Sequence, residues 1–327
     1  MEQSHLPRIT FGIPTLNEEK RLEVCLKSIF CQKYPKSKIE IIVIDGGSSD
    51  KTIEIAKKNN IKILINYRKL PEPGLALAYQ VAKGNYMVFM ATDNILYDEN
   101  WIIKMVQPFI DKPDIVYSTF SQVENKPSDN IWNKYINEDS DPFSLFTFGN
   151  ASHPNKYSKL YPTEFDSPKY VIYKFSPKNF PLIALAQCTI LKTGLSRSKV
   201  SQNDDILPLV ELINTNKKIA FIKNTGIYHL SIGSFQDLIQ KFNKRIYNSI
   251  STNSFISREK HTTIFRKIKK YLFIFYSFSI ILPIIHSIIL LIKNKKISYI
   301  VHFIVCFVIS FLIIYNFIKI YICKKLN

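Results

Sequence analysis

Apolar runs and amphipathic segments alternate along the first 110 residues of the chain. Runs of strand length fall at residues 9–13, 38–45, 61–66 and 86–91. Between the first two, residues 20–32 place apolar positions 22, 25, 26 and 29 on one helical face. Residues 46–58 and 74–84 predict two more helices. Strands that alternate with helices in this way predict an α/β fold with a mostly parallel sheet.

The alternation fades between Tyr117 and Pro181, where Pro, Asn, Ser and aromatic residues are frequent. Because many aromatic residues remain, this segment is interpreted as a long functional loop rather than as disorder. Regularity returns with a helix that begins near Asp204 and strands that lead to His229. Residues 8–230 are therefore predicted to form one catalytic domain.

Two charge-free apolar segments follow, at residues 271–292 and 297–318, separated by "KNKK". Each has 22 residues and would extend about 33 Å as a helix, enough to cross a bilayer. A buried hairpin of core helices would need polar faces that neither segment has. We predict two transmembrane helices within residues 269–323. An amphipathic basic segment precedes them at 231–268 and either lies on the membrane or is a solvated helix.

The positive charge is concentrated near these segments. Residues 231–327 contain 15 Lys and Arg but 2 acids, which is +13 of the chain's net +18. Such clusters favour anionic membrane lipids, whereas a basic surface for nucleic acid is missing. The N-terminal residues form no apolar signal segment, so a multi-pass cell-membrane protein with a cytoplasmic catalytic domain is expected. In that arrangement "KNKK" faces outward, although its three lysines run against the positive-inside rule.

Polar residues follow three of the predicted strands. They lie in "IPTLNEE", "IDGGSSDKT" and "MATDN". Ligands of open α/β sheets bind where the carboxyl ends of strands meet, so one crevice is expected to collect Pro14, Thr15, Glu18, Asp45, Thr92 and Asp93. The alternative for Asp45 is a turn-forming role before two glycines.

The order and spacing of these segments resemble the nucleotide-binding half of family 2 glycosyltransferases with the Rossmann-like GT-A fold. The resemblance is good over residues 8–110 and looser to about 230. It implies a nucleotide-sugar donor, with Asp45 accepting a base N–H and Pro14 and Glu18 lining the base and ribose. A NAD dehydrogenase is excluded, because no GxGxxG follows the first strand.

The resemblance also implies a metal site. Asp93, nine residues after Gly84, corresponds to the last acid of the family's DxD motif and would bind Mg²⁺ or Mn²⁺. Ala91 replaces the first acid, and Thr92–Asp93 matches a Thr–Asp pair of some members. Such ions need only one or two protein carboxylates when diphosphate and water supply the rest. His229 would complete the metal shell or, alternatively, be a packed core histidine.

An inverting transfer also needs a base on the acceptor hydroxyl. In the family this base belongs to an acidic pair at the start of a helix, which here is Asp204 and Asp205. Asp205 would be the acidic residue that acts as this base, and Asp204 would be its neighbour. Both are equally the residues that commonly cap a helix N-terminus.

Two departures from the family limit the comparison. Leu75 and Ala76 stand where the family often has Arg–Asn, and the QxxRW signature of processive enzymes is absent. We expect a metal-dependent inverting glycosyltransferase of hexosyl or N-acetylhexosaminyl type. It would add single sugars to a lipid-linked acceptor in cell-surface glycan biosynthesis. The alternatives are transfer onto polyprenyl phosphate and a non-catalytic membrane scaffold that descends from a transferase.

Overall fold

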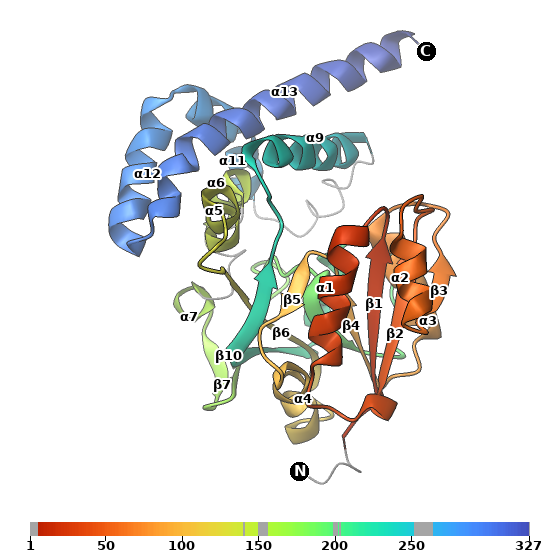
Figure 1. Ribbon diagram of the computed structural model, residues 1–327. Helices are drawn as coiled ribbons and strands as arrows, with labels where there is room; N and C mark the ends of the chain where they lie inside the picture. Colours follow the sequence, from red (N-terminus) through yellow and green to blue (C-terminus); the bar gives the residue numbers. More distant parts are fainter. Residues whose placement is uncertain are drawn as a thin grey trace. The chain divides into compact units, whose positions relative to one another are not determined.

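The computed structural model describes residues 6–139, 141–149, 156–198, 202, 204–251 and 264–326. The chain forms two compact units (Figure 1). Unit 1 comprises residues 1–124 and 154–229, and unit 2 comprises 125–153 and 230–327. The expected boundary near residue 230 coincides with a division between the units, but residues 125–153 group with the C-terminal helices. That the catalytic domain covers residues 8–230 and the membrane segments follow it stays a prediction.

The described part of unit 1 contains a ten-stranded sheet with the order β3-β2-β1-β4-β9-β6-β10-β8-β7, and β5 pairs with β10. Its strands are β1 (Ile9–Thr15), β2 (Ile39–Asp45), β3 (Lys62–Ile65), β4 (Tyr86–Met90), β5 (Asn94–Leu96), β6 (Val116–Glu124), β7 (Thr163–Asp166), β8 (Tyr170–Tyr173), β9 (Gln187–Lys192) and β10 (Lys218–His229).

The sheet is parallel only in part. Strands β3, β2, β1 and β4 run parallel, as do β6 and β10, but β9 runs antiparallel to both β4 and β6. Strands β5 and β8 also pair antiparallel with β10. The expectation of a mostly parallel sheet therefore holds for the first four strands, and the sheet as a whole is mixed. The antiparallel insertion of β9 joins the two parallel parts.

Helices cover both faces of this sheet. They are α1 (Glu19–Phe30), the short 3-10 helix η2 (Lys36–Lys38), α2 (Thr52–Lys58), α3 (Pro71–Val81), α4 (Trp101–Asp111), α7 (Tyr157–Leu160) and α8 (Leu207–Asn214). Alternate β4 residues serve the two faces: Val88 packs with α1 and α4, while Phe89 packs with α3 and α8. This alternation is the side-chain period of a strand that is buried on both sides.

The segment interpreted as a long loop contains regular structure. It includes α5 (Ile131–Asp139), α6 (Pro142–Phe148), α7, β7 and β8, so the loop interpretation is wrong for these elements. At the start of α6, the Asp141 carboxylate accepts a hydrogen bond from the Ser144 N–H at 2.9 Å, and Pro142 occupies the first turn. Asp followed by Pro is a helix-start signal that was available in the sequence.

Unit 2 is helical in its described residues. It contains α5, α6, α9 (Phe235–Ser251), α11 (Ile264–Phe278), α12 (Ile281–Asn294), the 3-10 helix η6 (Ile297–Val301) and α13 (His302–Leu326). Residues Ile297–Ile322 form a continuous stretch that is long and apolar enough to cross a membrane, and half of its most apolar window is buried inside the molecule.

The first predicted transmembrane helix is not a single helix. Helices α11 and α12 meet at 98°, with the break at Ser279 and Ile280. The Ser279 hydroxyl donates to the Tyr276 carbonyl at 2.7 Å and accepts from the Leu282 N–H at 3.3 Å. Pro283 lies in the first turn of α12, where a missing N–H costs no helical hydrogen bond. The Ser and Pro of "SFSIILP" were the sequence signal for this break.

A chain of hydrogen bonds runs through the interior of unit 2. The Tyr135 hydroxyl lies 2.6 Å from His302 Nδ1, and the Tyr276 hydroxyl lies 3.0 Å from His302 Nε2 and 2.8 Å from His286 Nδ1. His302 is only 1% exposed. The aromatic and imidazole groups thus connect α5, α11, α12 and α13.

Candidate functional site

The carboxyl ends of β1, β2 and β4 meet at one edge of the sheet. Thr15 and Asp45, the last residues of β1 and β2, are paired in register, and β1 also runs parallel to β4. The tip formed by residues 91–94 follows β4 directly. Most of the predicted donor-site residues therefore lie on neighbouring connections, as their strand-end positions require.

Asp45 holds its own turn in this structure. Its Oδ2 accepts hydrogen bonds from the N–H groups of Gly47 at 2.7 Å and Ser48 at 2.9 Å. Its Oδ1 accepts from the hydroxyls of Ser48 at 2.5 Å and Thr15 at 3.3 Å. The turn-forming alternative therefore describes these contacts. The hydroxyl groups of Ser48 and Thr15 can rotate away, which would leave Oδ1 able to accept an N–H of a nucleobase. This role of Asp45 stays a prediction.

The turn after β1 is joined to the turn after β2. The Glu18 N–H donates to the Thr52 hydroxyl at 2.8 Å, and the Ser49 N–H donates to the Asn17 side-chain oxygen at 2.8 Å. Pro14 lies beyond the last residue of β1 that pairs with β4, so its missing N–H leaves no ladder bond unmade. The two turns at this edge of the sheet are therefore held together by hydrogen bonds.

The tip after β4 brings Asp93 to His229. Strand β5 pairs antiparallel with the end of β10, where Asn94 lies opposite His229. The side chains of Asp93 and His229 are 11% and 14% exposed, and Asp93 Oδ2 lies 3.6 Å from His229 Nε2. Thr92, between Ala91 and Asp93, is buried. Two residues 136 positions apart, both predicted as metal ligands, thus face one point.

Two buried cysteine thiols, Cys25 and Cys188, lie near Asp93. The buried Cys25 thiol has its pKa raised, mainly by burial and further by the nearby carboxylates of Asp93 and Glu18. The same burial, with Cys25 and Asp93 nearby, raises the pKa of Cys188. Both thiols are therefore held protonated and unreactive. Asp93 and Glu18 therefore both lie near the Cys25 thiol.

Asp93 and His229 fit a divalent cation as a partial ligand set. Carboxylate oxygen and imidazole nitrogen are both ligands of Mn²⁺, and carboxylate is the ligand preferred by Mg²⁺. Among the described residues no group of three His, Cys, Asp or Glu side chains is arranged to hold a metal ion. Two protein ligands leave most of an octahedron to substrate oxygens and water, which is usual for metals that act on diphosphates.

The two acids before α8 make different contacts. The buried Asp204 accepts hydrogen bonds at Oδ1 from the N–H groups of Ile206 at 2.7 Å and Leu207 at 2.9 Å, which closes the turn that leads into α8; the N-cap residue itself is Ile206, which makes no side-chain cap bond. Asp205 is only partly buried, and its Oδ1 accepts from the Ala186 N–H at 3.0 Å. Asp204 thus holds the turn before α8 without being its N-cap residue, whereas Asp205 is bonded to another segment, and the catalytic roles of both stay predictions.

Ala186 connects this segment to the tip after β4. Its N–H holds Asp205, and its carbonyl accepts from the Ala91 N–H at 3.0 Å and the Asn94 side-chain amide at 2.8 Å. The candidate base and the candidate metal ligand therefore share one hydrogen-bonded frame. No motif in the sequence marks Ala186, although the buried Asn94, directly after Asp93, was visible as a polar residue in an apolar strand.

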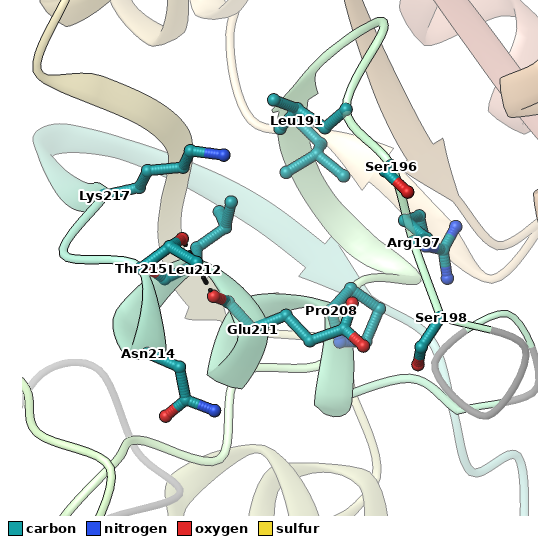
Figure 2. Close-up of a pocket in the computed structure, with 11 residues that line it drawn as sticks. Leu191, Ser196, Arg197, Ser198, Pro208, Glu211, Leu212, Asn214, Thr215 and Lys217 are labelled. Carbon is teal, nitrogen blue, oxygen red and sulfur yellow. Dashed lines mark hydrogen bonds between the residues drawn. The ribbon is translucent and has the colours of Figure 1, made fainter.

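Arg197 is a further residue that sequence reasoning missed. Its guanidinium lies 5.7 Å from the ring centre of Tyr79 and 5.8 Å from that of Phe89. Burial lowers its pKa, while Tyr79, Glu211, Asp205 and Asp204 oppose this. It also lines a cavity of about 300 Å³ with Glu211 and Lys217 (Figure 2). The lining residues include none of the predicted strand-end residues, so this cavity is separate from the metal-ligand pair.

Sequence comparison identifies the family. The profile described as glycosyl transferase family 2 matches residues 10–177, just over half of the chain. A glycosyltransferase named AglE from Haloferax volcanii is 43% identical over 67 residues, 19% of this chain and 22% of that protein.

A second curated relative comes from Methanococcus voltae. It is named dolichyl N-acetyl-alpha-D-glucosaminyl phosphate 3-beta-D-2,3-diacetamido-2,3-dideoxy-beta-D-glucuronosyltransferase. It is 36% identical over 87 residues, 24% of this chain and 27% of that protein. The matches to these two relatives therefore span only about a quarter of their lengths.

The fold is shared with a solved mannosyltransferase, PcManGT from Pyrobaculum calidifontis, whose structure contains GDP-Man and Mn²⁺. The similarity covers 97% of this chain and 88% of that chain, with a TM-score of 0.54 and 14% sequence identity. At this identity the likeness concerns the fold alone.

Proposed function

Because this chain belongs to glycosyl transferase family 2, we propose that it transfers a sugar from a nucleotide-sugar donor to a lipid-linked acceptor at a membrane. The observation that carries this proposal is the Asp93–His229 pair, 3.6 Å apart beside the edge where β1, β2 and β4 end. A decayed, non-catalytic scaffold would have no reason to keep a carboxylate and an imidazole facing one point.

In the proposed reaction the acceptor oxygen forms a bond to the anomeric carbon as the bond to the diphosphate breaks. The hydroxyl proton passes to the Asp205 carboxylate, the nucleoside diphosphate leaves, and the anomeric configuration inverts. Asp93 and His229 would hold Mg²⁺ or Mn²⁺, which supplies positive charge for the leaving diphosphate. Thr15, Thr92 and the joined turns that carry Pro14, Glu18 and Asp45 would bind and orient the nucleoside.

The hydrogen-bonded frame at Ala186 supports Asp205 as the base. Its Oδ1 is fixed by a backbone N–H, and the same residue is bonded to the tip that carries Asp93. A catalytic group must be fixed relative to the reacting atoms, because small displacements cost large factors in rate. Asp204 would stabilise the start of α8 and hold Asp205 in place.

The acceptor proposal rests on two observations of different kinds. Large exposed apolar side chains gather on residues 264–322 of unit 2, which suits contact with lipid. The relative from M. voltae has a name that specifies a dolichyl-linked sugar phosphate. Transfer directly onto polyprenyl phosphate is the second candidate, since the same apolar surface would serve it. A cytoplasmic location of unit 1 stays a prediction.

Thermal unfolding of the full chain in detergent tests the donor and the metal. UDP or GDP together with Mn²⁺ should raise the melting temperature, and a ligand at 100 times its dissociation constant contributes about 2.7 kcal/mol. Asp93→Ala should abolish the manganese-dependent part of this shift. The exposed Asp114, elsewhere in unit 1, provides a matched control: Asp114→Ala should respond like the wild type.

The alternatives give different results in the same assay. If neither UDP nor GDP stabilises the wild type in the presence of Mn²⁺, the result favours the scaffold alternative. If nucleotide binds and Asp93→Ala retains the full manganese-dependent shift, Asp93 is not the metal ligand. Radiolabelled sugar transfer to extracted lipids, compared with transfer to purified polyprenyl phosphate, then separates the two acceptor classes.

A further inference from the structure

Helix α13 is long enough to cross a bilayer, yet both of its halves are packed against helices that are tethered to unit 1. From these contacts we infer that α13 lies along the membrane surface, with its exposed face in one leaflet, and does not cross the bilayer. This inference rests on the membrane association proposed above and concerns its geometry. It replaces the predicted transmembrane hairpin with an in-plane platform.

The beginning of α13 is held by α5. The Tyr135 hydroxyl lies 2.6 Å from His302 Nδ1, and the Tyr135 ring meets that of Tyr299 edge-on at 6.3 Å between centroids. Glu138, one turn further along α5, forms an ion pair with Lys296 in the "KNKK" loop. The loop that was expected to face outward is thus bonded to a helix that follows β6.

The second half of α13 is held by α9. The Asn316 side-chain amide donates to Asn243 Oδ1 at 2.7 Å, and Lys319 lies 5.6 Å from the ring centre of Tyr247. Leu238, Phe242 and Ile246 of α9 belong to the same apolar cluster as Val305, Ile309 and Leu312 of α13. Figure 1 shows α9 running alongside α13.

Short links tie both supporting helices to unit 1. Residues 125–130 join β6 to α5, and residues 230–234 join β10 to α9. Six residues reach at most about 21 Å, which is less than the ~30 Å hydrocarbon thickness. Helices α5 and α9 therefore stay on the side of the membrane where unit 1 lies. Helix α5 holds the beginning of α13, and α9 holds its second half. Both parts of α13 must therefore stay on that side of the membrane too.

An upright α13 would take α9 into the bilayer with it. The outer face of α9 exposes Gln240, Lys244 and Arg245. Each cation at the bilayer centre lowers the equilibrium constant for insertion of a helix by about a hundredfold or more. This arrangement is therefore strongly disfavoured. In the in-plane arrangement the same cations lie at the level of the lipid headgroups, where anionic lipid attracts them.

The side chains of α13 that face away from α9 are apolar. Phe307, Phe311, Tyr315 and Ile318 are each at least 45% exposed and follow one another at helical spacing. Helices α11 and α12 also expose apolar side chains, but they have 15 and 14 residues and are about 22 and 21 Å long, too short to span the core. The partner that suits this apolar surface with cations around it is one leaflet of an anionic membrane.

Cysteine accessibility in oriented vesicles tests the arrangement. The background carries Cys31→Ser and Cys323→Ser, because the other three thiols are buried. In this background Lys293→Cys probes the last turn of α12 and Lys325→Cys probes the end of α13. The separate variant Cys323→Ser keeps native Cys31, which is exposed on unit 1 and reports the side of unit 1. A membrane-impermeant maleimide is applied to right-side-out and inside-out vesicles.

The in-plane arrangement predicts that both probes label from the same side as Cys31. Labelling of position 293 alone from the opposite side would establish the hairpin, and labelling of 325 alone from the opposite side would establish a single span. Either result overturns the inference. Full-length protein that stays soluble overturns both this inference and the membrane proposal. Membrane-bound protein that binds no nucleotide leaves the inference standing and removes the proposed enzyme function.

Depth provides an independent check. Phe311→Trp should be quenched by lipids brominated near the headgroup more strongly than by lipids brominated near the bilayer centre, and the reverse order would contradict the in-plane position. Phe311→Glu should weaken binding to vesicles of anionic phospholipid by about tenfold. Ile110→Glu, an exposed apolar residue of unit 1, is the matched control and should bind like the wild type.

Discussion

The two units of this molecule arrange polar and apolar side chains in opposite ways. In unit 1 the sheet is buried between two apolar layers, and its acids lie at the edge where strands end. In unit 2 hydrogen-bonded groups such as Tyr135, His302 and Asn316 are buried, while large apolar side chains are exposed along α11, α12 and α13.

This difference is what the proposed association of unit 2 with a membrane predicts. A chain in water gains stability by removing apolar area from the solvent, which unit 1 does. In lipid no such gain exists, and helices are held together by packing and by hydrogen bonds between buried polar groups. Unit 2 combines both, since its α9 side carries cations and its α13 side carries phenylalanine and isoleucine. The two units therefore differ in which side chains they bury: mainly apolar ones in unit 1, and hydrogen-bonded polar groups as well in unit 2.

The largest expected effect concerns an acid at the edge of unit 1. Asp205→Asn keeps an oxygen that can accept the Ala186 N–H, so the fold and donor binding should be unchanged. Turnover should fall by about two to four orders of magnitude, because an amide cannot take the acceptor proton. Initial rates with a nucleotide sugar and a lipid extract measure this. Near-normal turnover would remove Asp205 from the mechanism.

A matched pair of phenylalanines tests the opposite burial directly. Phe11 is fully buried in unit 1, and Phe311 is 56% exposed on α13. Phe11→Ala should lower the free energy of unfolding by about 3–5 kcal/mol. In detergent, Phe311→Ala should change it by less than about 0.5 kcal/mol. Chemical denaturation of both variants decides this, and equal losses would contradict the comparison.

The buried polar groups of unit 2 should contribute less. Tyr135→Phe removes the hydroxyl that meets His302 and leaves a buried ring nitrogen without that partner, at a cost of about 1–3 kcal/mol. Tyr247, 41% exposed on α9, is the control, and Tyr247→Phe should be nearly neutral. Thermal unfolding in the same detergent compares them. A neutral Tyr135→Phe would show that the network adds little stability.

The smallest effect should come from the turn that leads into α8. Asp204→Ala removes the acceptor for two backbone N–H groups and should cost about 1 kcal/mol. Asp204→Asn should cost less, because the asparagine side-chain oxygen can accept the same two N–H bonds. Urea titration of both variants gives these values. If Asp204→Asn instead abolished turnover while Asp205→Asn did not, the catalytic role would belong to Asp204.

The sequence was sufficient for the parts of the fold that are specified locally. Apolar periodicity predicted β1, β2, β4 and the helical face of Leu22 and Ile29, because each element buries its own pattern. The antiparallel position of β9 could not be predicted, since its neighbours β4 and β6 lie about 100 and about 70 residues earlier. The break at Ser279 was a different failure: Pro283 marked it, but the length of the apolar run was given more weight.

The places of the candidate site residues in the fold were predictable to a similar extent, while their roles stay predictions. Strand ends located Asp45 and the Thr92–Asp93 tip, and the family resemblance selected His229 and Asp205. The contacts of each carboxylate were not predictable, because Asp204 and Asp205 are chemically identical and differ only in which backbone groups they meet. Nothing in the local sequence of Ala186 signals that its two peptide groups connect Asp205 to the tip.

The position of Ala186 has a kinetic consequence. A single φ/ψ pair separates the carbonyl that holds the tip from the N–H that holds Asp205. Any shift of the tip when the donor binds is therefore transmitted to Asp205 through one rotatable residue. We expect the two substrates to add in a compulsory order, donor before acceptor, with the nucleoside diphosphate as the last product released. Product-inhibition patterns would then be competitive for the nucleoside diphosphate against the donor alone.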